Sequence, residues 1–319
     1  MIEIFTNPDA WYQNHLTVIQ AVLVFSLLAM SIQVCMRAGV FSLASVGFWA
    51  IGGYTSANLV KVHHLAHPFA IVIAILLASS IGVLFSLPLL RLRGLYMGLA
   101  TIAFDLVVVV LALNGGTLTG GPLGLFGIPV RVTVPQLVGV VAVVGYLLTR
   151  LETGRTGRYF DALRNDEPLA AALGIRVNRW RVFAFTLSAA IAALSGSMHV
   201  LLFNAISPEQ FGFSLIILVL SMVVVGGAAS WVGALIGAAL IEFLPEFLST
   251  FDKWRDVAYG VLLILVVGYA PDGILGLVQQ GFRRLVGRTG KPSSTALPAG
   301  PPAASVGATP VAGQTEALP

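Results

Sequence analysis

The stretch LTVIQAVLVFSLLAMSIQVCM, residues 16–36, contains no charged side chain and decides the fold class. A helix of this length rises about 31 Å, at about 1.5 Å per residue. The hydrocarbon core of a bilayer is about 30 Å thick, so we expect residues 16–36 to cross a membrane. Residues 1–15 carry Glu3 and Asp9 where a cleaved export signal would be basic. We therefore expect this first helix to be retained.

Similar runs recur along the chain, which is 57% hydrophobic and only 10% charged and has a mean hydropathy of +0.91. Soluble domains rarely have such a composition, so the sequence predicts an all-α, polytopic transmembrane helical bundle of eight or nine spans. Span 39–60 is polar and glycine-rich and is expected to be broken or re-entrant, and span 134–149 is short. The expected spans are 16–36, 39–60, 68–90, 94–113, 134–149, 182–203, 214–229, 231–249 and 257–271.

The basic residues lie beside the spans and predict the topology. If segment 150–181 is cytoplasmic, fourteen of the eighteen Lys and Arg residues fall on the cytoplasmic side. The positive-inside rule then places the N-terminus outside and the C-terminus inside. The net charge of +4 therefore reflects topology and does not indicate a nucleic-acid partner.

The expected organisation is one transmembrane domain between two short terminal segments. Residues 1–15 form the extracytoplasmic N-terminus, and residues 16–278 form the membrane domain with its cytoplasmic segment at 150–181. Residues 279–319 form a cytoplasmic tail that is first basic and then disordered. From Thr289 onward the tail is rich in Ala, Pro, Gly and Ser and has no apolar periodicity, so it lacks the means to form a core.

Segment 150–181 is unusual in this chain because it holds seven arginines and four acidic residues. Its local signals predict two short helices. One runs over 157–165, and the second begins where Glu167 can cap and Pro168 occupies the first helical position. The second helix ends at Gly174. Two interpretations follow: a docking unit for a partner protein, or a solvated loop whose arginines only fix topology.

The stretch GRYFDALRNDEPLAAALGI, residues 157–175, resembles the cytoplasmic coupling motif in membrane permease subunits of branched-chain amino acid ABC importers of the LivM type. Pro168 departs from the motif but is compatible with a helix start. The residues that match are Gly157, Arg158, Ala162, Leu163, Arg164, Asp166, Glu167, Ala170, Ala171, Gly174 and Ile175. The resemblance implies that Gly157, Arg158, Ala162, Arg164, Asp166, Glu167, Ala171 and Gly174 couple the chain to an ATPase.

Further stretches resemble the same family in the same order, over roughly residues 35 to 278. They are RLRGLYMGLATIAF (91–104), TGGPLGL (119–125), ISPEQFGF (206–213) and VVVGGAASWVGALIGAAL (223–240). The resemblance implies a multi-pass protein of a bacterial inner membrane, in contact with lipid. The implied partners are two cytoplasmic ATPase subunits, a second permease subunit, which is expected to be a homologous hetero-partner, and an extracytoplasmic substrate-binding protein.

Three polar residues are candidates for the translocation pathway. Asp105 lies in the middle of span 94–113, where a carboxylate facing lipid would cost about 3 kcal/mol. It either faces a wet cavity or is held in a helix contact. The family's acidic residue lies at the position of Leu106 in this chain, one residue later, which turns the side chain by about 100°. Ser42 and Ser45 either line the path or allow close helix packing.

No catalytic, metal or cofactor site is expected. His63 and His67 have helical spacing but no carboxylate or cysteine beside them, and Gly290-Lys291 lacks the upstream glycine of a phosphate loop. ATP hydrolysis is therefore expected from partner subunits, and the chain is not expected to be an enzyme. The alternatives are a permease of the same type for urea or amides, or a stand-alone secondary transporter, which would need more ionisable groups inside the membrane. An integral-membrane enzyme is disfavoured because no nucleophile–base set is visible.

Overall fold

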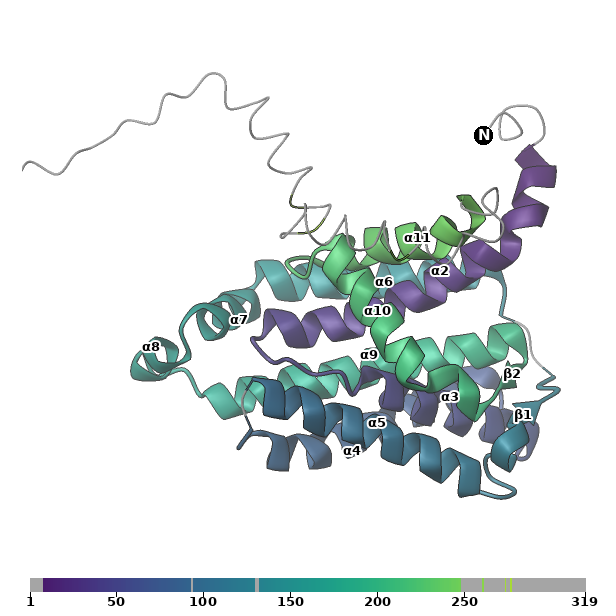
Figure 1. Ribbon diagram of the computed structural model, residues 1–319, viewed down its shortest axis with the longest axis horizontal. Coiled ribbons are helices and arrows are strands. Elements are labelled where there is room, and N and C mark those ends of the chain that lie inside the picture. Colours follow the sequence, from purple (N-terminus) through teal and green to yellow (C-terminus); the bar gives the residue numbers. More distant parts are fainter. Residues whose placement is uncertain are drawn as a thin grey trace, which may run out of the picture. The chain divides into compact units, whose positions relative to one another are not determined.

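A computed structural model of the chain describes residues 8–92, 94–129 and 132–247, together with Gly260, Gly273 and Gly276. All of them belong to one compact unit, Met1–Gln280. Long helices dominate this unit (Figure 1). The helices are α2 (Pro8–Arg37), α3 (Ser45–Lys61), α4 (His67–Leu89), α5 (Leu95–Asn114), α6 (Val134–Thr153), α7 (Arg155–Asn165), α8 (Glu167–Ala172), α9 (Val177–Phe203), α10 (Phe213–Gly226) and α11 (Trp231–Phe247).

Helix α9 is the centre of the packing, because α2, α3 and α4 all pack against it. Small residues make the closest approaches possible. A Cβ at Gly196 of α9 would overlap the Trp49 carbonyl, and a Cβ at Gly52 of α3 would overlap the Ala193 backbone. The face of α4 that is buried repeats small residues every four positions, at Ala70, Ala74, Ala78 and Gly82. Close packing of this kind is the means by which helices associate inside a membrane.

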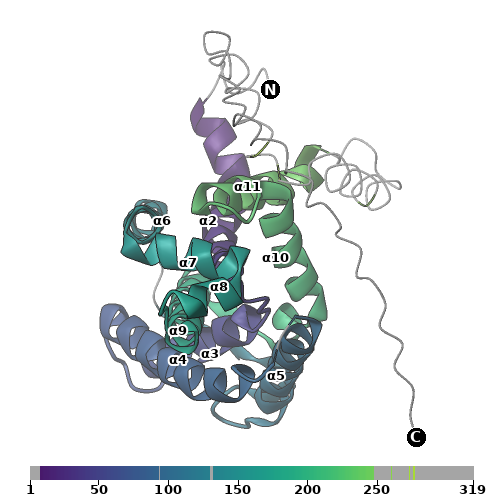
Figure 2. The same ribbon diagram turned by 90° about the vertical axis from the view of Figure 1, so that its left-hand side faces the viewer.

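The two ends of the bundle differ (Figure 1). Helices α7 and α8 lie at one end, and they face the viewer in Figure 2. At the opposite end lie two short 3-10 helices, η1 (Gly121–Leu123) and η2 (Pro208–Phe211), and an antiparallel pair of two-residue strands, β1 (Leu125–Phe126) and β2 (Ala205–Ile206). The Lys61 ammonium, at the end of α3, donates to the Phe126 carbonyl over 2.8 Å. We refer to these as the α7–α8 end and the β1–β2 end.

Five helices of the described residues are long and apolar enough to cross a membrane: α2 from His15, α4, α5, α6 and α9. Helices α10 and α11, expected as two spans, form a pair bent by 119° at a short break and raise the number to six if the pair is one span. The expected span 39–60 starts as a helix only at Ser45, so the resulting helix α3 has 17 residues. The prediction of eight or nine spans is therefore not confirmed. The expected span 257–271 and the tail 279–319 lie outside the described residues, apart from Gly260.

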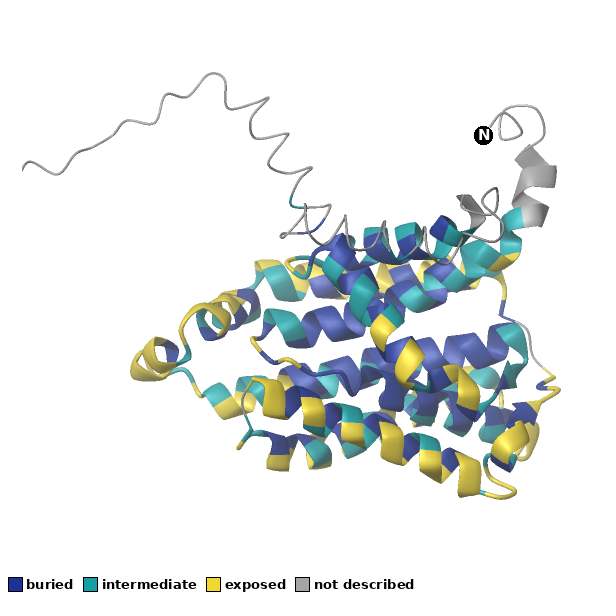
Figure 3. Cartoon of the chain, in the orientation of Figure 1, coloured by how far each residue is buried: buried dark blue, intermediate teal, exposed yellow. Residues whose placement is uncertain are grey.

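Apolar side chains cover the outer faces of α4, α5 and α6, where Figure 3 shows exposed residues along the helices. Only 28% of the most apolar part of α4 is buried, whereas 78% of the most apolar part of α9 is buried. This contrast places α9 inside the bundle and α4 at its surface. Exposed residues of this kind include Phe69, Leu76, Leu84, Leu99, Leu106, Val143 and Leu147. Such a surface fits contact with lipid chains.

Candidate functional site: the α7–α8 unit and the buried polar residues

The two short helices predicted in the charged segment are present as α7 and α8. Helix α7 begins at Arg155, two residues before the predicted start. It is amphipathic, because Gly157, Phe160 and Leu163 are buried on one face and the charged residues between them are exposed or partly exposed. The apolar face explains why this segment folds onto the bundle instead of remaining a solvated loop.

The boundary between α7 and α8 is capped by Asp166, so the expectation that Glu167 caps it was wrong. Asp166 has an extended backbone (φ −154°, ψ 99°) and its Oδ1 accepts the Leu169 N–H over 3.0 Å. A short carboxylate at that position suits an N-cap better than the longer Glu167, which is already helical. Pro168 is the second helical residue, whereas it was predicted to be the first. Gly174 follows α8 at φ +83°, in agreement with the predicted end of the helix.

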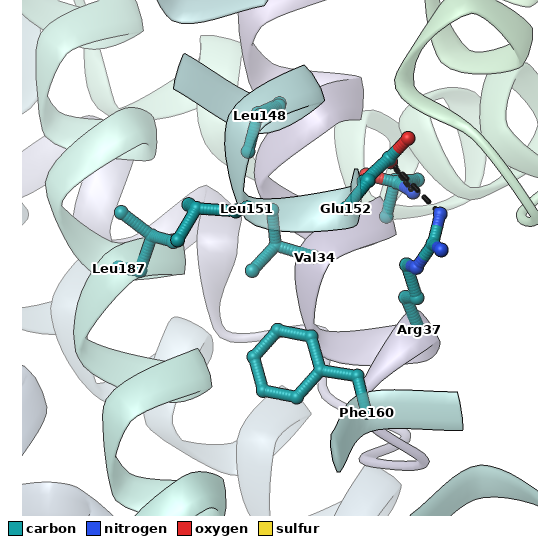
Figure 4. Close-up of a pocket in the computed structure, with 8 residues that line it drawn as sticks. Val34, Arg37, Leu148, Leu151, Glu152, Phe160 and Leu187 are labelled. Carbon is teal, nitrogen blue, oxygen red and sulfur yellow. Dashed lines mark hydrogen bonds and ion pairs between the residues drawn. The ribbon is translucent and has the colours of Figure 1, made fainter. Parts of the chain in front are cut away.

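Arg37, the last residue of α2, holds the α7–α8 unit to the bundle. Its Nη1 lies 3.1 Å from Glu152 Oε1 at the end of α6, and its Nη2 lies 3.6 Å from Asp161 Oδ1 on α7. Nη1 also donates to the Ala229 carbonyl, between α10 and α11, over 2.8 Å. One guanidinium thus joins four parts of the chain, and Figure 4 shows its contact with Glu152.

A second ion pair ties α8 to α9, because Arg181 Nη2 lies 2.8 Å from Glu167 Oε2. Aromatic contacts lie beside it. The Trp180 ring is 4.8 Å from the Tyr159 ring and 6.1 Å from the Phe160 ring, measured between centroids. Phe160 also lines a cavity of about 10 Å³, together with Val34, Arg37, Leu148, Leu151, Glu152 and Leu187 (Figure 4) and with Gln33.

Gly39 lets the chain turn beneath α7. Its φ is +73°, which favours glycine, and a Cβ there would meet Arg164 Cα at 3.2 Å. The end of α2 and the end of α7 are therefore in backbone contact. This contact and the Arg37–Asp161 and Arg181–Glu167 ion pairs connect the α7–α8 unit to α2 and α9, and α7 also packs on α6.

The candidate coupling residues divide into an inner and an outer set. Gly157 is buried, and a Cβ there would overlap the Glu152 carbonyl. Ala162 and Glu167 are half-buried. The outer set is exposed and consists of Arg158, Arg164, Asp166, Ala171 and Gly174, and the side chains of Leu169 and Leu173 are exposed beside it.

Asp105 lies in a helix contact between α5 and α3 and is only 1% exposed. Its Oδ1 accepts the Gly47 N–H over 2.8 Å. One turn earlier on α5, the Thr101 hydroxyl oxygen accepts the Leu43 N–H over 3.1 Å. Because Gly47 is in the first turn of α3, α5 satisfies amide groups that this helix start would leave without partners. The described residues therefore support the helix-contact alternative, and a pathway role for Asp105 stays a prediction.

Ser42 and Ser45 are both buried. Ser42 lies in the non-helical link before α3, and its Oγ accepts the Ala44 N–H at 3.4 Å. The Ser45 and Ser188 hydroxyl oxygens lie 3.1 Å apart, which joins α3 to α9. Ser45 and Asp105 thus both act at the start of α3, where Ser45 contacts α9 and Asp105 contacts Gly47 from α5. The structure does not bring them to the α7–α8 unit.

Sequence reasoning missed the residues that attach the unit, namely Arg37, Glu152 and Arg181. It used Arg37 and Arg181 for topology alone. A usable signal existed, because Arg37 and Glu152 end two apolar spans that were expected to finish on the same side. Opposite charges in that position can pair at the membrane surface. Among the described residues, no group of three or more His, Cys, Asp or Glu side chains could hold a metal ion.

Comparison with known proteins gives one family. The family described as "Branched-chain amino acid transport system / permease component" matches residues 14–267. The high-affinity branched-chain amino acid transport system permease protein LivM of Escherichia coli (strain K12) is 31% identical over 275 residues, which cover 76% of this chain and 65% of that protein. The permease protein LivH of the same system and strain is 33% identical over 124 residues, 38% of this chain and 40% of that protein.

A third relative carries a different substrate in its name. The ribose import permease protein RbsC of Haemophilus influenzae is 26% identical over 294 residues, which cover 85% of this chain and 88% of that protein. The match to the E. coli LivM protein, in contrast, spans slightly less than two thirds of the length of that protein. No solved structure matches.

Proposed function

Because the chain belongs to the family of branched-chain amino acid transport system permease components, we propose that it is a membrane-spanning subunit of an ATP-driven importer for branched-chain or other amino acids. The chain itself hydrolyses no ATP in this proposal. Two cytoplasmic ATPase subunits supply the energy, and an extracytoplasmic protein delivers the substrate to the β1–β2 end. The membrane is the inner membrane of a bacterium.

The observation that carries this proposal is the construction of the α7–α8 unit. The unit is fixed to α2 by the Arg37–Asp161 pair and to α9 by the Arg181–Glu167 pair, and Arg37 also joins α2 to the end of α6 through Glu152. Its outer face presents two arginines, Arg158 and Arg164, next to the exposed side chains of Leu169 and Leu173. A helical surface with both apolar and charged groups suits insertion into a groove of another protein.

The attachments also suggest how force would pass from the ATPases to the membrane helices. When the two ATPases close, each displaces the α7–α8 unit seated in it. The displacement reaches α2 through Arg37 and α9 through Arg181. Since α2 and α3 both pack on α9, a rigid shift of α9 moves the helices that surround the pathway, which is the requirement for alternating access.

The similarity to both LivM and LivH supports a second permease subunit as the partner inside the membrane. We also propose that the crossings number eight or nine. This number includes α3, α10 and α11 as crossings and adds the expected span 257–271. The N-terminus then lies outside. In this arrangement the α7–α8 end is cytoplasmic, which places Arg158 and Arg164 on the side that the positive-inside rule requires.

Two other functions remain as alternatives. A permease of the same construction for urea or amides would use the same α7–α8 unit, so the substrate has to be measured. A secondary transporter acting alone is disfavoured, because a docking surface for an ATPase would then have no purpose and coupling by ions normally uses several intramembrane charges. Co-purification separates the two classes, since only the importer retains an ATPase.

The test reverses both outer arginines, as Arg158→Glu with Arg164→Glu, in the tagged chain expressed in its own host. We expect the variant to reach the membrane at the normal level but to lose the co-purifying ATPase and substrate-stimulated ATP hydrolysis. The matched control is Arg176→Glu with Arg179→Glu, an equal charge change at two exposed positions at the start of α9, at the same end of the bundle. Retention of the ATPase and of stimulated hydrolysis by the double variant would remove the assignment of this surface.

A further inference from the structure

A second cavity, of about 380 Å³, lies away from the α7–α8 unit. The four helices α2, α3, α9 and α10 contribute to it, together with η2. The lining residues of α9, η2 and α10 lie toward the β1–β2 end. His199 is four residues before the end of α9, and Ser214 is the second residue of α10. The lining residues are Phe25, Trp49, His199, Gln210, Ser214, Leu215 and Leu218.

The walls of this cavity are mainly apolar and aromatic. The His199 ring lies 4.8 Å from the Trp49 ring and 6.2 Å from the Phe25 ring, measured between centroids. Leu215 and Leu218 supply an aliphatic wall on α10. None of the seven lining residues has a carboxylate, an ammonium or a guanidinium group. A pocket with these walls takes a small molecule with a substantial apolar part.

Two side chains of the cavity lining, His199 and Trp49, have buried ring nitrogens without hydrogen-bond partners among the described residues. His199 is only 9% exposed, and neither of its ring nitrogens has a hydrogen-bond partner among the described residues. The same is true of the Trp49 indole nitrogen. The Gln210 amide lies close to the imidazole, but the geometry gives no hydrogen bond between them. The Gln210 Oε1 instead accepts the Ser207 N–H at 3.4 Å. Buried polar groups are seldom left in this condition unless they have a functional partner.

We propose that this cavity is a substrate site and that it binds an α-amino acid with an apolar side chain. The assignment rests on the proposed function for the class of solute, and on the cavity for the location. A neutral imidazole has one N–H donor and one acceptor nitrogen. It can therefore donate to the carboxylate of a zwitterion and accept from its ammonium group. The indole N–H of Trp49 is a second donor for the carboxylate.

A pentose and urea fit the walls of this cavity less well than an apolar amino acid. A pentose carries hydroxyl groups on all sides, and several of them would face Phe25, Leu215 and Leu218 without partners. Burial of each such hydroxyl costs about 1–3 kcal/mol. Urea has no apolar part to use these walls. The aliphatic side chain of leucine or valine, in contrast, gains free energy from each carbon that it buries.

The test fills the cavity from its exposed rim. Ser214→Trp places a large ring at the cavity, and Ser214 is exposed, so the fold tolerates the change. The matched control is Ile217→Trp, which adds a ring to an exposed position of the same helix outside the cavity lining. We expect Ser214→Trp to lower uptake of radiolabelled L-leucine by about tenfold or more, with normal ATPase co-purification, and the control to transport normally.

A second pair of variants tests the imidazole itself. His199→Phe keeps an aromatic ring but removes both polar nitrogens, and His199→Gln keeps a donor and an acceptor. The loss of one hydrogen bond to a charged group corresponds to about a tenfold weaker affinity for L-leucine, so we expect that loss in His199→Phe and a smaller loss in His199→Gln. His63→Gln in the exposed link before α4 is the control.

Direct binding keeps this test independent of the proposed function. L-leucine binding to the purified chain in lipid nanodiscs is followed by saturation-transfer NMR, with D-ribose and urea as competitors. If the chain supports no uptake and retains no ATPase, the importer assignment falls, while leucine binding that Ser214→Trp abolishes still supports the site. The proposal of this site is overturned if Ser214→Trp and His199→Phe leave leucine binding unchanged, or if ribose or urea binds there in preference.

Discussion

The attachment of the α7–α8 unit by Arg37 makes a quantitative prediction. The perturbations are Arg37→Gln, Glu152→Gln and Asp161→Asn, combined in two double-mutant cycles. Each cycle isolates the interaction of Arg37 with one carboxylate, so that the other partners of Glu152, such as the Gln33 amide at 3.2 Å, cancel. The quantity compared is the coupling free energy of unfolding in each cycle.

The two coupling energies differ because the two carboxylates differ in burial. Arg37 and Glu152 are 15% and 16% exposed in their side chains and 3.1 Å apart. Unit charges at 4 Å attract by about 4 kcal/mol in surroundings of intermediate polarity. Because the desolvation of each group cancels in the cycle, we expect a coupling energy of about 2–4 kcal/mol. The Asp161 side chain is 57% exposed and 3.6 Å away. Exposed pairs contribute about 0.2–1 kcal/mol, so we expect a value in that range.

The assay is reversible unfolding of the purified chain in mixed micelles of mild detergent and dodecyl sulfate, followed by circular dichroism. Each variant is also tested for substrate-stimulated ATP hydrolysis with its partners. We expect Arg37→Gln to reduce this stimulation more than Asp161→Asn, because Arg37 also holds Glu152 and the Ala229 carbonyl. A coupling energy for Glu152 that is no larger than that for Asp161 would refute the reasoning from burial.

Three further predictions concern single contacts. Glu167→Arg should impair coupling to the ATPase by breaking the ion pair with Arg181, and the swap Glu167→Arg with Arg181→Glu should restore ATPase stimulation. Failure of the swap would assign Glu167 to the ATPase interface itself. Asp105→Asn should preserve uptake, whereas Asp105→Ala should lower the unfolding free energy by about 1–3 kcal/mol by removing a buried acceptor. A pathway role would instead be supported if the Asn variant were inactive at normal stability and if Asp105→Cys, in a Cys35→Ser background, reacted with polar thiol reagents. Gly196→Ala should lower the free energy of unfolding by more than about 3 kcal/mol, because its Cβ overlaps a backbone carbonyl. In a thermal unfolding assay, a decrease of only a few degrees in Tm would contradict the packing of α3 on α9.

Local signals in the sequence were sufficient for the α7–α8 unit. Pro168 and Gly174 determine where helix α8 begins and ends through their own backbone preferences, and these preferences need no tertiary structure. The long apolar runs likewise predicted α2, α4, α5, α6 and α9. The error at the boundary, Glu167 in place of Asp166, arose because Pro168 was expected at the first helical position, which makes the residue before it the N-cap, whereas Pro168 is the second helical residue.

Contacts between distant segments determined what the sequence could not predict. The start of α3 is held by residues 58 positions later in the chain, since Asp105 accepts the Gly47 N–H in the first turn and Thr101 accepts the Leu43 N–H just before the helix. The break between α10 and α11 contains Gly227 at φ +105°, but glycines are frequent throughout these spans and do not mark one position. The cavity at His199 joins residues of four helices, and a single histidine in an apolar span does not reveal such a neighbourhood.

The packing of α3 on α9 also affects the order of events during synthesis. Helix α3 ends at Lys61 and α9 begins at Val177, and ribosomes add about 5–20 residues each second. Helix α3, with its glycines and hydroxyl groups, therefore waits for about 6–23 s before its principal neighbour emerges. During that interval it must be sheltered by the insertion machinery or by α2, α4 and α5. Substitutions at Gly52, where a Cβ would overlap the Ala193 backbone, are thus expected to reduce the yield of the inserted protein as well as its stability, because an α3 that fails to dock on α9 remains open to proteolysis.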